Sequence, residues 1–237
     1  MSKNNKKTAG DDFVRDFFKK YPKFYYFIAV CFGPLMLTGL SPKKFISKYL
    51  LDEMKVINVG SGPRRINENV INIDIFEHKG VDIIASLKEL PLKNDSVDGI
   101  ICDNVLEHVE NPSLAIQEMY RVLKPGGYLY VSTPFLYPFH GSPSDYQRWT
   151  KKGMEHLLRD FLIKDSSLRA GPASALTIWC CYAFATLFSF GNDRLYWLLI
   201  NMALFIFFPI KILDLILNHL PNAVNMAASI YCVVQKK

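Results

Sequence analysis

The sequence has few cysteines, and none of them has the spacing of a metal site. The five cysteines form no C-x-x-C pair and do not combine with histidine at zinc-site spacing. We therefore expect free thiols in a reducing compartment. Residues 1–10 are basic, but no apolar core or small-residue cleavage site follows them, which argues against a secretory signal. These absences favour a cytoplasmic protein.

The chain is basic, but it has no recognised nucleic-acid-binding motif. It carries 28 Lys and Arg against 22 Asp and Glu, a formal net charge of +6. Without such a motif, we expect no nucleic-acid partner. Lysines gather within residues 3–23 and 43–48, beside aromatic residues. This combination suits peripheral contact with an anionic membrane surface, which would be the inner face of the membrane for a cytoplasmic protein.

Charge is missing altogether from two long stretches near the end of the chain. Residues 173–190 and 195–210 contain no charged side chain, and a polar turn at 191–194 separates them. The pattern predicts a hydrophobic helical hairpin. Each run is close to the lower limit for spanning a hydrocarbon core of about 30 Å, and Asp214 interrupts the apolar residues beyond Lys211. Shallow membrane insertion, a pocket for an apolar substrate or a homodimer interface would each bury this surface, and we favour membrane contact.

A short apolar run followed by two glycines marks the start of the core. Residues 56–59 form this run with one polar member, as expected for a strand buried on both faces of a parallel sheet. Gly60 and Gly62 follow directly, and without Cβ atoms they allow a sharp turn and close backbone approach to a ligand. The next apolar run, 71–76, contains Asp74, whose carboxylate is placed to accept hydrogen bonds from two ribose hydroxyls. Together these features predict a nucleoside-binding half of an α/β sheet.

Later segments extend this pattern. A buried strand is predicted at 98–102, the sequence NVLEHV follows at 104–109, and RVLKPGG at 121–127 precedes another strand at 128–132. At these motifs the chain resembles the class I S-adenosylmethionine-dependent methyltransferases of the type 11 group, over residues 55–161. The resemblance implies an α/β, Rossmann-like fold with a seven-stranded, mostly parallel sheet and an antiparallel last strand. It also implies S-adenosyl-L-methionine as the cofactor.

The pattern divides the chain into five parts. We expect a helix that Ser41 caps, a second helix that begins after Asn111 and ends at the glycines of 124–127, and a third that Thr150 caps. The sixth and seventh strands are predicted at 162–168 and 229–235, so the hydrophobic hairpin is an insertion between them. The parts are a disordered basic tail at 1–11, an N-terminal helical cap at 12–51, the methyltransferase core at 52–170, the helical insertion at 171–225 and the final core strand at 226–237. The cap either covers the cofactor site, as in the family, or simply packs on the sheet.

The resemblance assigns a set of cofactor-binding residues. The turn would hold the amino-acid end of the cofactor, Asp74 the ribose, Ser86 and Leu87 the adenine, and Asn104 the approach to the methyl group. Two positions depart from the family, because Asn58 and Ser86 stand where it usually carries acidic residues. The full predicted set is Asn58, Gly60, Ser61, Gly62, Asp74, Ile75, Ser86, Leu87, Asn104 and Val105.

The catalytic and substrate-binding candidates lie beyond the fourth and fifth predicted strands. His140 is the first choice of base and His108 the second, because an unperturbed imidazole titrates near neutral pH. Packing is an equally good role for Glu107 and His108. Related ubiquinone-pathway O-methyltransferases hold a metal with a Glu and a His at these positions and with an earlier Glu; that earlier position is Asn104 here, so no metal is expected.

The loop of residues 134–150 is rich in proline, glycine and aromatic residues, which is typical of a substrate-binding wall. Its candidate substrate-binding residues are Phe135, Asp145, Tyr146 and Arg148. Alternatively, Asp145 and Arg148 pair with each other to hold the loop closed.

Two functions remain open at this point. The first is a methyltransferase (EC 2.1.1.-) that acts on a hydrophobic or lipid-linked small molecule at a membrane surface. The second is a membrane-associated binding protein that has the methyltransferase fold without catalysis, which the departures at Asn58 and Ser86 would favour. A third alternative, also an enzyme, is a soluble sugar or small-molecule methyltransferase that dimerises through the hairpin.

Overall fold

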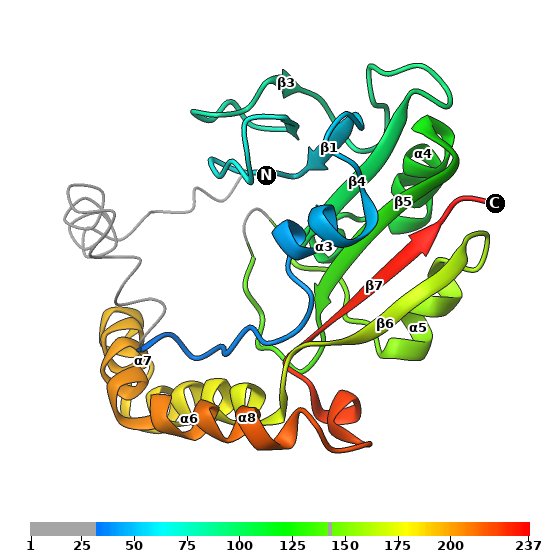
Figure 1. Cartoon of the computed structure of the whole chain (residues 1–237). Coiled ribbons are helices and arrows are strands. Elements are labelled where there is room, and N and C mark those ends of the chain that lie inside the picture. Colours follow the sequence, from blue (N-terminus) through cyan, green and yellow to red (C-terminus); the bar gives the residue numbers. More distant parts are fainter. Residues whose placement is uncertain (1–31, 142–143) are drawn as a thin grey trace.

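The computed structural model describes residues 32–141 and 144–237, so the predicted tail at 1–11 and half of the predicted N-terminal cap, residues 12–31, lie outside the described residues. The chain forms one sheet with helices on both faces (Figure 1). Its strands are β1 (Val56–Val59), β2 (Val70–Asp74), β3 (Ile83–Ile84), β4 (Val97–Asp103), β5 (Leu123–Pro134), β6 (Leu162–Ala170) and β7 (Ser229–Gln235). The main helices that pack on them are α3 (Pro42–Tyr49), α4 (Pro112–Val122) and α5 (Lys151–Leu157).

The sheet confirms the predicted fold class. Its strand order is β3-β2-β1-β4-β5-β7-β6. The first five strands pair in parallel, and β7 runs antiparallel to both β5 and β6. Because β1 lies between β2 and β4, the carboxyl ends of these three strands meet at one edge of the sheet. That edge is where open α/β sheets bind their ligands.

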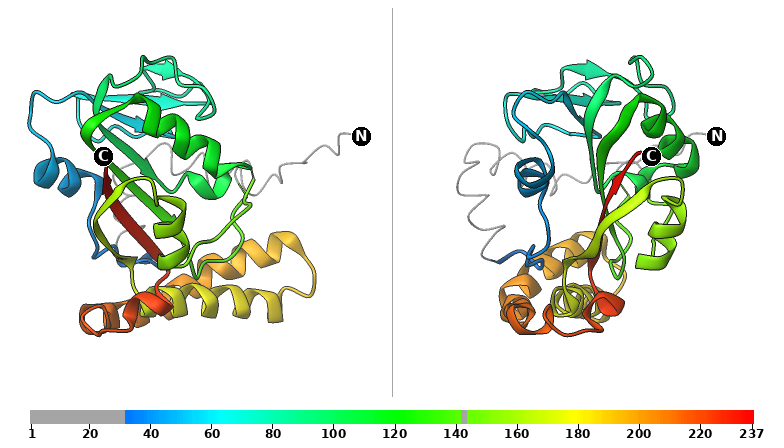
Figure 2. Two further views of the ribbon diagram at one scale, coloured as in Figure 1. Left: turned by 90° about the vertical axis from the view of Figure 1, so that its right-hand side faces the viewer. Right: turned by 45° about the vertical axis from the view of Figure 1, so that its right-hand side comes forward.

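Separate apolar clusters cover the two faces of the sheet. On one face Phe45 of α3 is fully buried against Tyr130 of β5. On the other face Met119 of α4 and Met154 of α5 are buried against the sheet. Figure 2 shows α3 on one side of the sheet and α4 and α5 on the other.

The helix starts were predictable from local capping chemistry. The Ser41 hydroxyl accepts a hydrogen bond from the Lys44 N–H at 3.2 Å, and the Thr150 hydroxyl accepts one from the Gly153 N–H at 3.0 Å. Each satisfies an N–H that has no partner within its own helix. These caps therefore formed at the predicted positions.

One predicted boundary is wrong. We expected the glycines of 124–127 to end the second helix, but α4 already ends at Val122 and β5 begins at Leu123, five residues before the predicted strand. Leu123 pairs with Val97 of the neighbouring strand. Gly126 has a φ of 77° within this strand rather than at a helix end. Pairing with β4 therefore decides the conformation here, not the local glycine signal.

A helical insertion follows β6, as the charge-free runs predicted. It comprises α6 (Pro172–Phe188), α7 (Asp193–Phe207), the 3₁₀ helix η2 (Phe208–Leu213), α8 (Asp214–Leu217) and the 3₁₀ helix η3 (Ala223–Met226). The helical stretch Asp193–Leu217 has 25 residues, and in length and composition it could cross a membrane. Only 22% of its most apolar window is buried. A core helix of a soluble protein can pass the same test of length and composition, but it would be mostly buried.

Asp214 does not interrupt the apolar surface of this insertion, contrary to our expectation. Its side chain is fully buried and accepts hydrogen bonds from the Ala173 N–H at 2.8 Å, the Ser174 N–H at 3.0 Å and the Ser174 hydroxyl at 2.6 Å. Lys211 is also turned inward, and its ammonium donates to the Gly33 carbonyl at 2.6 Å. Both charges therefore stabilise the inside of the insertion and leave its outer face apolar.

We predict that Asp214→Ala lowers the free energy of unfolding by about 1–3 kcal/mol, because it leaves two N–H groups at the start of α6 and one hydroxyl without their acceptor. Urea unfolding followed by circular dichroism measures the change. Asp160→Ala, at an exposed position, is the control and should stay within about 0.5 kcal/mol of wild type. Equal stability of the two variants would contradict the capping role of Asp214.

Candidate functional site

The glycine turn and Asp74 meet at the edge of the sheet. Gly60 and Gly62 have positive φ values of 65° and 55°, which favour glycine. A Cβ on Gly60 would lie 2.5 Å from the Val105 side chain, so no larger residue fits at this position. One oxygen of Asp74 accepts a hydrogen bond from the Gly62 N–H at 2.7 Å, and the other accepts from the Phe76 N–H at 2.9 Å. The carboxylate therefore fixes the turn, and each oxygen keeps lone-pair capacity for another donor.

A cavity of about 260 Å³ opens beside this turn. The ends of β1 and β2 and the segments after β3 and β4 contribute to it. Six predicted cofactor-binding residues line it: Gly60, Asp74, Ile75, Ser86, Leu87 and Val105. The Ser86 hydroxyl accepts a hydrogen bond from the Lys88 N–H at 3.2 Å, and Leu87 packs against the core. The Asp74 carboxylate beside these apolar walls is a suitable environment for a nucleoside, and a second carboxylate, that of Glu110, also lines the cavity.

A second cavity, of about 390 Å³, shares Gly60 with the first. It contains three more of the predicted residues, Asn58, Ser61 and Asn104, together with charged side chains that the sequence analysis missed. These are Lys43, Arg64, Arg65, Asp103 and Arg169. Asp103 ends β4, so extending the predicted strand by one residue would have found it. No local signal points to Arg169. It lies near the end of β6, far along the chain from the other residues of this cavity, and only the folded sheet brings it there.

Asn58 also supports the turn, and Gly62 is the one predicted cofactor-binding residue that lines neither cavity. The Asn58 side-chain amide donates to the Asn72 side-chain oxygen at 3.2 Å, and Asn72 donates in turn to the Arg64 and Gly80 carbonyls. Gly62 has open space around the position of a Cβ. Two cavities that meet at a glycine turn, one mainly apolar with a carboxylate and the other lined by charged groups, fit a nucleoside joined to an amino acid.

The β5–α5 loop (residues 135–150) docks on the turn after β4. The NVLEHV segment forms the 3₁₀ helix η1 (Leu106–His108), and Asn111 then caps the separate helix α4. The Tyr146 N–H donates to the Glu107 carbonyl at 2.8 Å. Nδ1 of His108 makes a short contact with the Ser144 carbonyl. These contacts bring residues of the loop against η1.

Both predicted catalytic histidines lie in one cluster with Glu107. The two imidazole rings stand edge to face with their centroids 5.1 Å apart. The nearer Glu107 oxygen lies 3.8 Å from Nε2 of His108 and 3.7 Å from Nε2 of His140. The Glu107 side chain is fully buried, and neither of its oxygens has a hydrogen-bond partner. The sequence analysis gave Glu107 only a packing role.

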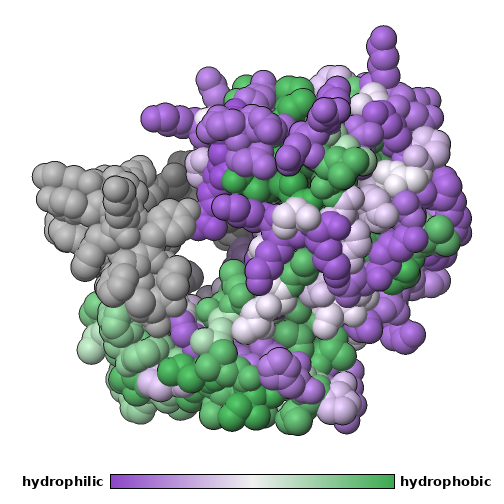
Figure 3. Space-filling model, in the orientation of Figure 1, coloured by the Kyte–Doolittle hydropathy of each residue, from purple (hydrophilic) through white to green (hydrophobic). Residues whose placement is uncertain are grey.

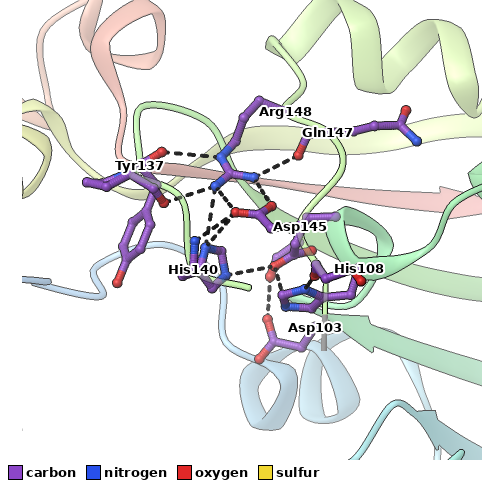
Figure 4. A network of polar contacts seen from close by, with 11 residues as sticks. Asp103, His108, Tyr137, His140, Asp145, Gln147 and Arg148 are labelled. Atoms are coloured by element: carbon purple, nitrogen blue, oxygen red, sulfur yellow. Dashed lines mark hydrogen bonds and ion pairs between the residues drawn. The ribbon is translucent and has the colours of Figure 1, made fainter. Parts of the chain in front are cut away.

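Asp145 and Arg148 form an ion pair that holds the loop (Figure 4). The guanidinium contacts both Asp145 oxygens and donates to the Tyr137 and Pro138 carbonyls at 3.3 and 3.0 Å. The Asp145 side chain is only 1% exposed, and hydrogen bonding from Arg148 is the main reason that its pKa falls to about 2. This is the structural alternative that the sequence left open, and substrate binding by either residue stays a prediction.

The other two substrate-binding candidates differ in exposure. Tyr146 is exposed and lines the 260 Å³ cavity. Phe135 is partly buried and packs against the core cluster that faces α4. Of this pair, Tyr146 is the side chain that a ligand in the cavity could touch.

We predict that Arg148→Met raises the pKa of Asp145 and lowers the free energy of unfolding at pH 7 by about 1–2 kcal/mol. The folded-state pKa is below its usual value, so this contribution is present above about pH 4 and is lost as the pH falls toward 2. The difference between variant and wild type should shrink over that window. Urea unfolding at several pH values and a carboxyl NMR titration measure both effects.

The control for this prediction is Lys152→Met, which removes an exposed ammonium 3.4 Å from a Glu155 oxygen. Surface pairs of this kind contribute little, so its stability should change by less than about 0.5 kcal/mol. A stability loss in Arg148→Met that is independent of pH would show that the guanidinium acts by packing instead.

Comparison with known proteins agrees with these features. Residues 63–131 match a family model described as a methyltransferase domain. An uncharacterized methyltransferase of Mycolicibacterium vanbaalenii is 35% identical over 108 residues, which are 45% of this chain and 42% of that protein. A probable S-adenosylmethionine-dependent methyltransferase of Mycolicibacterium smegmatis is 45% identical over 50 residues, 21% of this chain and 20% of that protein. The matches thus span less than half of these relatives.

Solved structures share the fold at low identity. The Burkholderia thailandensis 1,6-didemethyltoxoflavin-N1-methyltransferase, bound to its substrate and S-adenosylhomocysteine, has a TM-score of 0.51 and 14% identity over 99% of this chain and 93% of its own. The [4+2]-cyclase SpnF has a TM-score of 0.50 and 18% identity over 82% of this chain and 80% of its own. Because a methyltransferase and a cyclase both appear, these likenesses establish the fold alone.

Proposed function

We propose that this chain, of which residues 63–131 match a methyltransferase-domain model, is an S-adenosylmethionine-dependent methyltransferase. Its acceptor in this proposal is a hydrophobic or lipid-linked small molecule at a membrane surface. The observation that carries this proposal is the position of the insertion. Its exposed apolar helices begin and end at the same edge of the sheet as the two cavities, since Ser229, which follows the insertion, pairs with Pro134 of β5 and Ala170 of β6.

Residues around the glycine turn bind the cofactor in this proposal. Bound there, S-adenosylmethionine supplies a methyl group on a positively charged sulfur for in-line transfer. The turn of Gly60 to Gly62 and the charged second cavity hold the amino-acid end. Asp74 accepts hydrogen bonds from the ribose, while Ile75 and Leu87 contact the adenine beside Ser86. The main task of these groups is to hold donor and acceptor in line.

His108 and His140 act on the acceptor. His108 lines the cavity that contains Asp74, and the ring of His140 lies 5.1 Å from that of His108. Tyr146 forms part of the same wall. The acceptor group therefore lies between the cofactor cavity and the β5–α5 loop, where the two imidazoles can reach its proton.

We predict that Asp74→Ala weakens binding of S-adenosylhomocysteine by at least about 100-fold, because the variant loses the ribose acceptor and the bond that fixes the Gly62 N–H. Isothermal titration calorimetry measures the affinity. Glu77→Ala is the matched control, since Glu77 is an exposed acidic residue three positions further on. Near-normal affinity in Asp74→Ala would contradict the assignment of this cavity.

Transfer of a labelled methyl group tests the activity itself. The protein and radiolabelled S-adenosylmethionine are incubated with a lipid extract of the cells that produce the protein. A separate reaction contains an aqueous extract of the same cells instead. Label in the lipid extract with wild type and none with Asp74→Ala supports the proposal. Label only in the aqueous extract would instead favour a soluble small-molecule methyltransferase. Binding of cofactor without any transfer would favour the non-catalytic alternative.

The surface of the insertion supports membrane contact. Of the 26 exposed large hydrophobic residues in the described chain, 14 lie between Leu176 and Ile216, far more than scattered surface exposure requires. Figure 3 shows apolar side chains gathered over the part of the molecule that α6–α8 form. Trp179 and Trp197 are half exposed on these helices, and tryptophan is favoured at membrane interfaces. The same surface could pair two copies of the chain, which is the alternative to a membrane.

A set of contacts joins the buried side of α6 to the candidate catalytic cluster. Tyr137 packs against the apolar cluster that contains Ile178 of α6. The ring of Tyr137 also meets that of His140 edge to face, with centroids 5.0 Å apart. An apolar acceptor held at the insertion would therefore lie next to the loop that carries His140.

We predict that the full chain binds vesicles of phosphatidylcholine with one-third phosphatidylglycerol. Replacing Trp197, Phe205 and Ile206 by serine should weaken binding by at least about tenfold, because each buried apolar side chain contributes roughly 1.5–3 kcal/mol. Replacing Leu51, Leu114 and Leu162, which are similarly exposed outside the insertion, is the control. Co-sedimentation measures binding. A wild-type protein that stays in the supernatant in the vesicle experiment, and that is a dimer by analytical ultracentrifugation without vesicles, would show that the face pairs two copies instead.

A further inference from the structure

We infer that Glu107, His108 and His140 bind a divalent transition-metal ion. Each residue offers one ligand atom, and these three atoms all lie within 4.8 Å of one another. Glu107 is the strongest evidence, because its carboxylate is fully buried while neither oxygen has a hydrogen-bond partner. A buried carboxylate without hydrogen-bond partners is destabilising, and the two imidazole nitrogens at 3.7 and 3.8 Å are too far away to supply hydrogen bonds. A metal ion would supply the missing interaction.

The distances suit a site that closes slightly around an ion. The nearer Glu107 oxygen lies 3.7 Å from Nε2 of His140 and 3.8 Å from Nε2 of His108. Metal bonds of about 2.0–2.2 Å to nitrogen and oxygen place neighbouring ligand atoms roughly 3.0–3.5 Å apart. The two Glu107–histidine distances therefore need to shorten by only a few tenths of an ångström. The ligand atoms of the two histidines lie within 4.8 Å of each other, and both side chains are partly exposed and can move closer together.

The second nitrogen of each imidazole is held by a group that fixes the ring for metal binding. Nδ1 of His108 contacts the Ser144 carbonyl, which can only accept, so Nδ1 carries the proton and Nε2 keeps its lone pair. Nδ1 of His140 lies 3.4 Å from an Asp145 oxygen. Nη2 of Arg148 also lies within hydrogen-bond distance of Nδ1 at 3.4 Å, so metal binding through Nε2 requires that Asp145, not Arg148, be the partner of Nδ1. Carboxylate–histidine pairs of this kind orient metal-binding imidazoles.

The ligand types indicate which metals fit. Two imidazoles and one carboxylate suit Zn²⁺ or Fe²⁺ better than Mg²⁺ or Ca²⁺, which prefer oxygen ligands. Three protein ligands also leave a coordination position open. Because His108 lines the cavity beside the cofactor residues, an oxygen of the acceptor could occupy that position.

This inference replaces the expectation of no metal. That expectation rested on Asn104, which cannot supply a carboxylate. In the folded chain the third ligand comes instead from His140, which the β5–α5 loop brings to η1 through the bond between Tyr146 and Glu107. Metal binding itself does not depend on the proposed methyl transfer. Only the catalytic role of the metal depends on that proposal. In that role, both histidines would act on the acceptor through the metal rather than by taking the acceptor's proton directly.

Metal titration of the untagged, full-length protein after chelator treatment tests the inference. We expect calorimetry to show that one equivalent of Zn²⁺ binds. One equivalent of Co²⁺ should give the visible d–d absorption of a low-coordinate cobalt site. Glu107→Gln and His140→Asn should each weaken Zn²⁺ binding by more than about 100-fold, because loss of a supporting partner alone costs roughly 10–100-fold. His156→Asn, which removes an exposed histidine on α5, is the matched control and should bind as wild type does.

Two further readouts make the result decisive. Zn²⁺ should raise the thermal midpoint of wild type but not that of Glu107→Gln, which keeps the shape of the side chain and is expected to fold. S-adenosylhomocysteine affinity should stay within about threefold of wild type in both ligand variants, so a failure of cofactor binding is seen separately from a failure of metal binding. Equal Zn²⁺ affinity in wild type and Glu107→Gln, or no saturable binding to wild type, would overturn the inference.

Discussion

Parallel pairing of β1 with β2 and with β4 is the interaction on which the candidate site depends. The register places Val59 beside both Ile73 and Cys102, so all three strands deliver the chain to the same edge of the sheet. The turn after β1 and the turn after β4 then approach so closely that only glycine fits at position 60. Backbone hydrogen bonds between the strands thus set the arrangement of the turns at this edge.

Polar contacts, together with the packing of Phe135 and Tyr137, hold the β5–α5 loop against η1. The Tyr146 N–H bonds to the Glu107 carbonyl, and the buried pair of Asp145 and Arg148 fixes the described parts of the loop around His140. Nearly every polar group in this network has a partner. The Glu107 carboxylate is the exception, and a network that satisfies its neighbours so fully gives no structural reason for leaving it unpaired. A ligand-binding role explains the exception, whereas packing does not.

The parts that could be predicted from the sequence are those with local signals. The glycine turn, the Ser41 and Thr150 caps and the strand β7 follow from residues within a few positions of one another, and the structure has them where expected. Features that depend on distant partners were missed. Leu123 begins a strand because Val97 lies beside it, although the nearby glycines suggested a helix end. Asp214 looked like an exposed charge because its partners at the start of α6 lie about 40 residues away.

The same reasoning explains why the cluster of Glu107 with two histidines was not predicted as a unit. Resemblance to a family compares residues at fixed positions within one motif. Within NVLEHV, position 104 is an asparagine, which has no carboxylate to bind a metal. Tertiary structure adds a ligand from another element, since the loop after β5 returns across η1. Its first residues also pack on α6, so Tyr137 touches both the apolar insertion and His140. In the proposed function, a membrane or a partner that covers the insertion would therefore be connected to His140 through Tyr137.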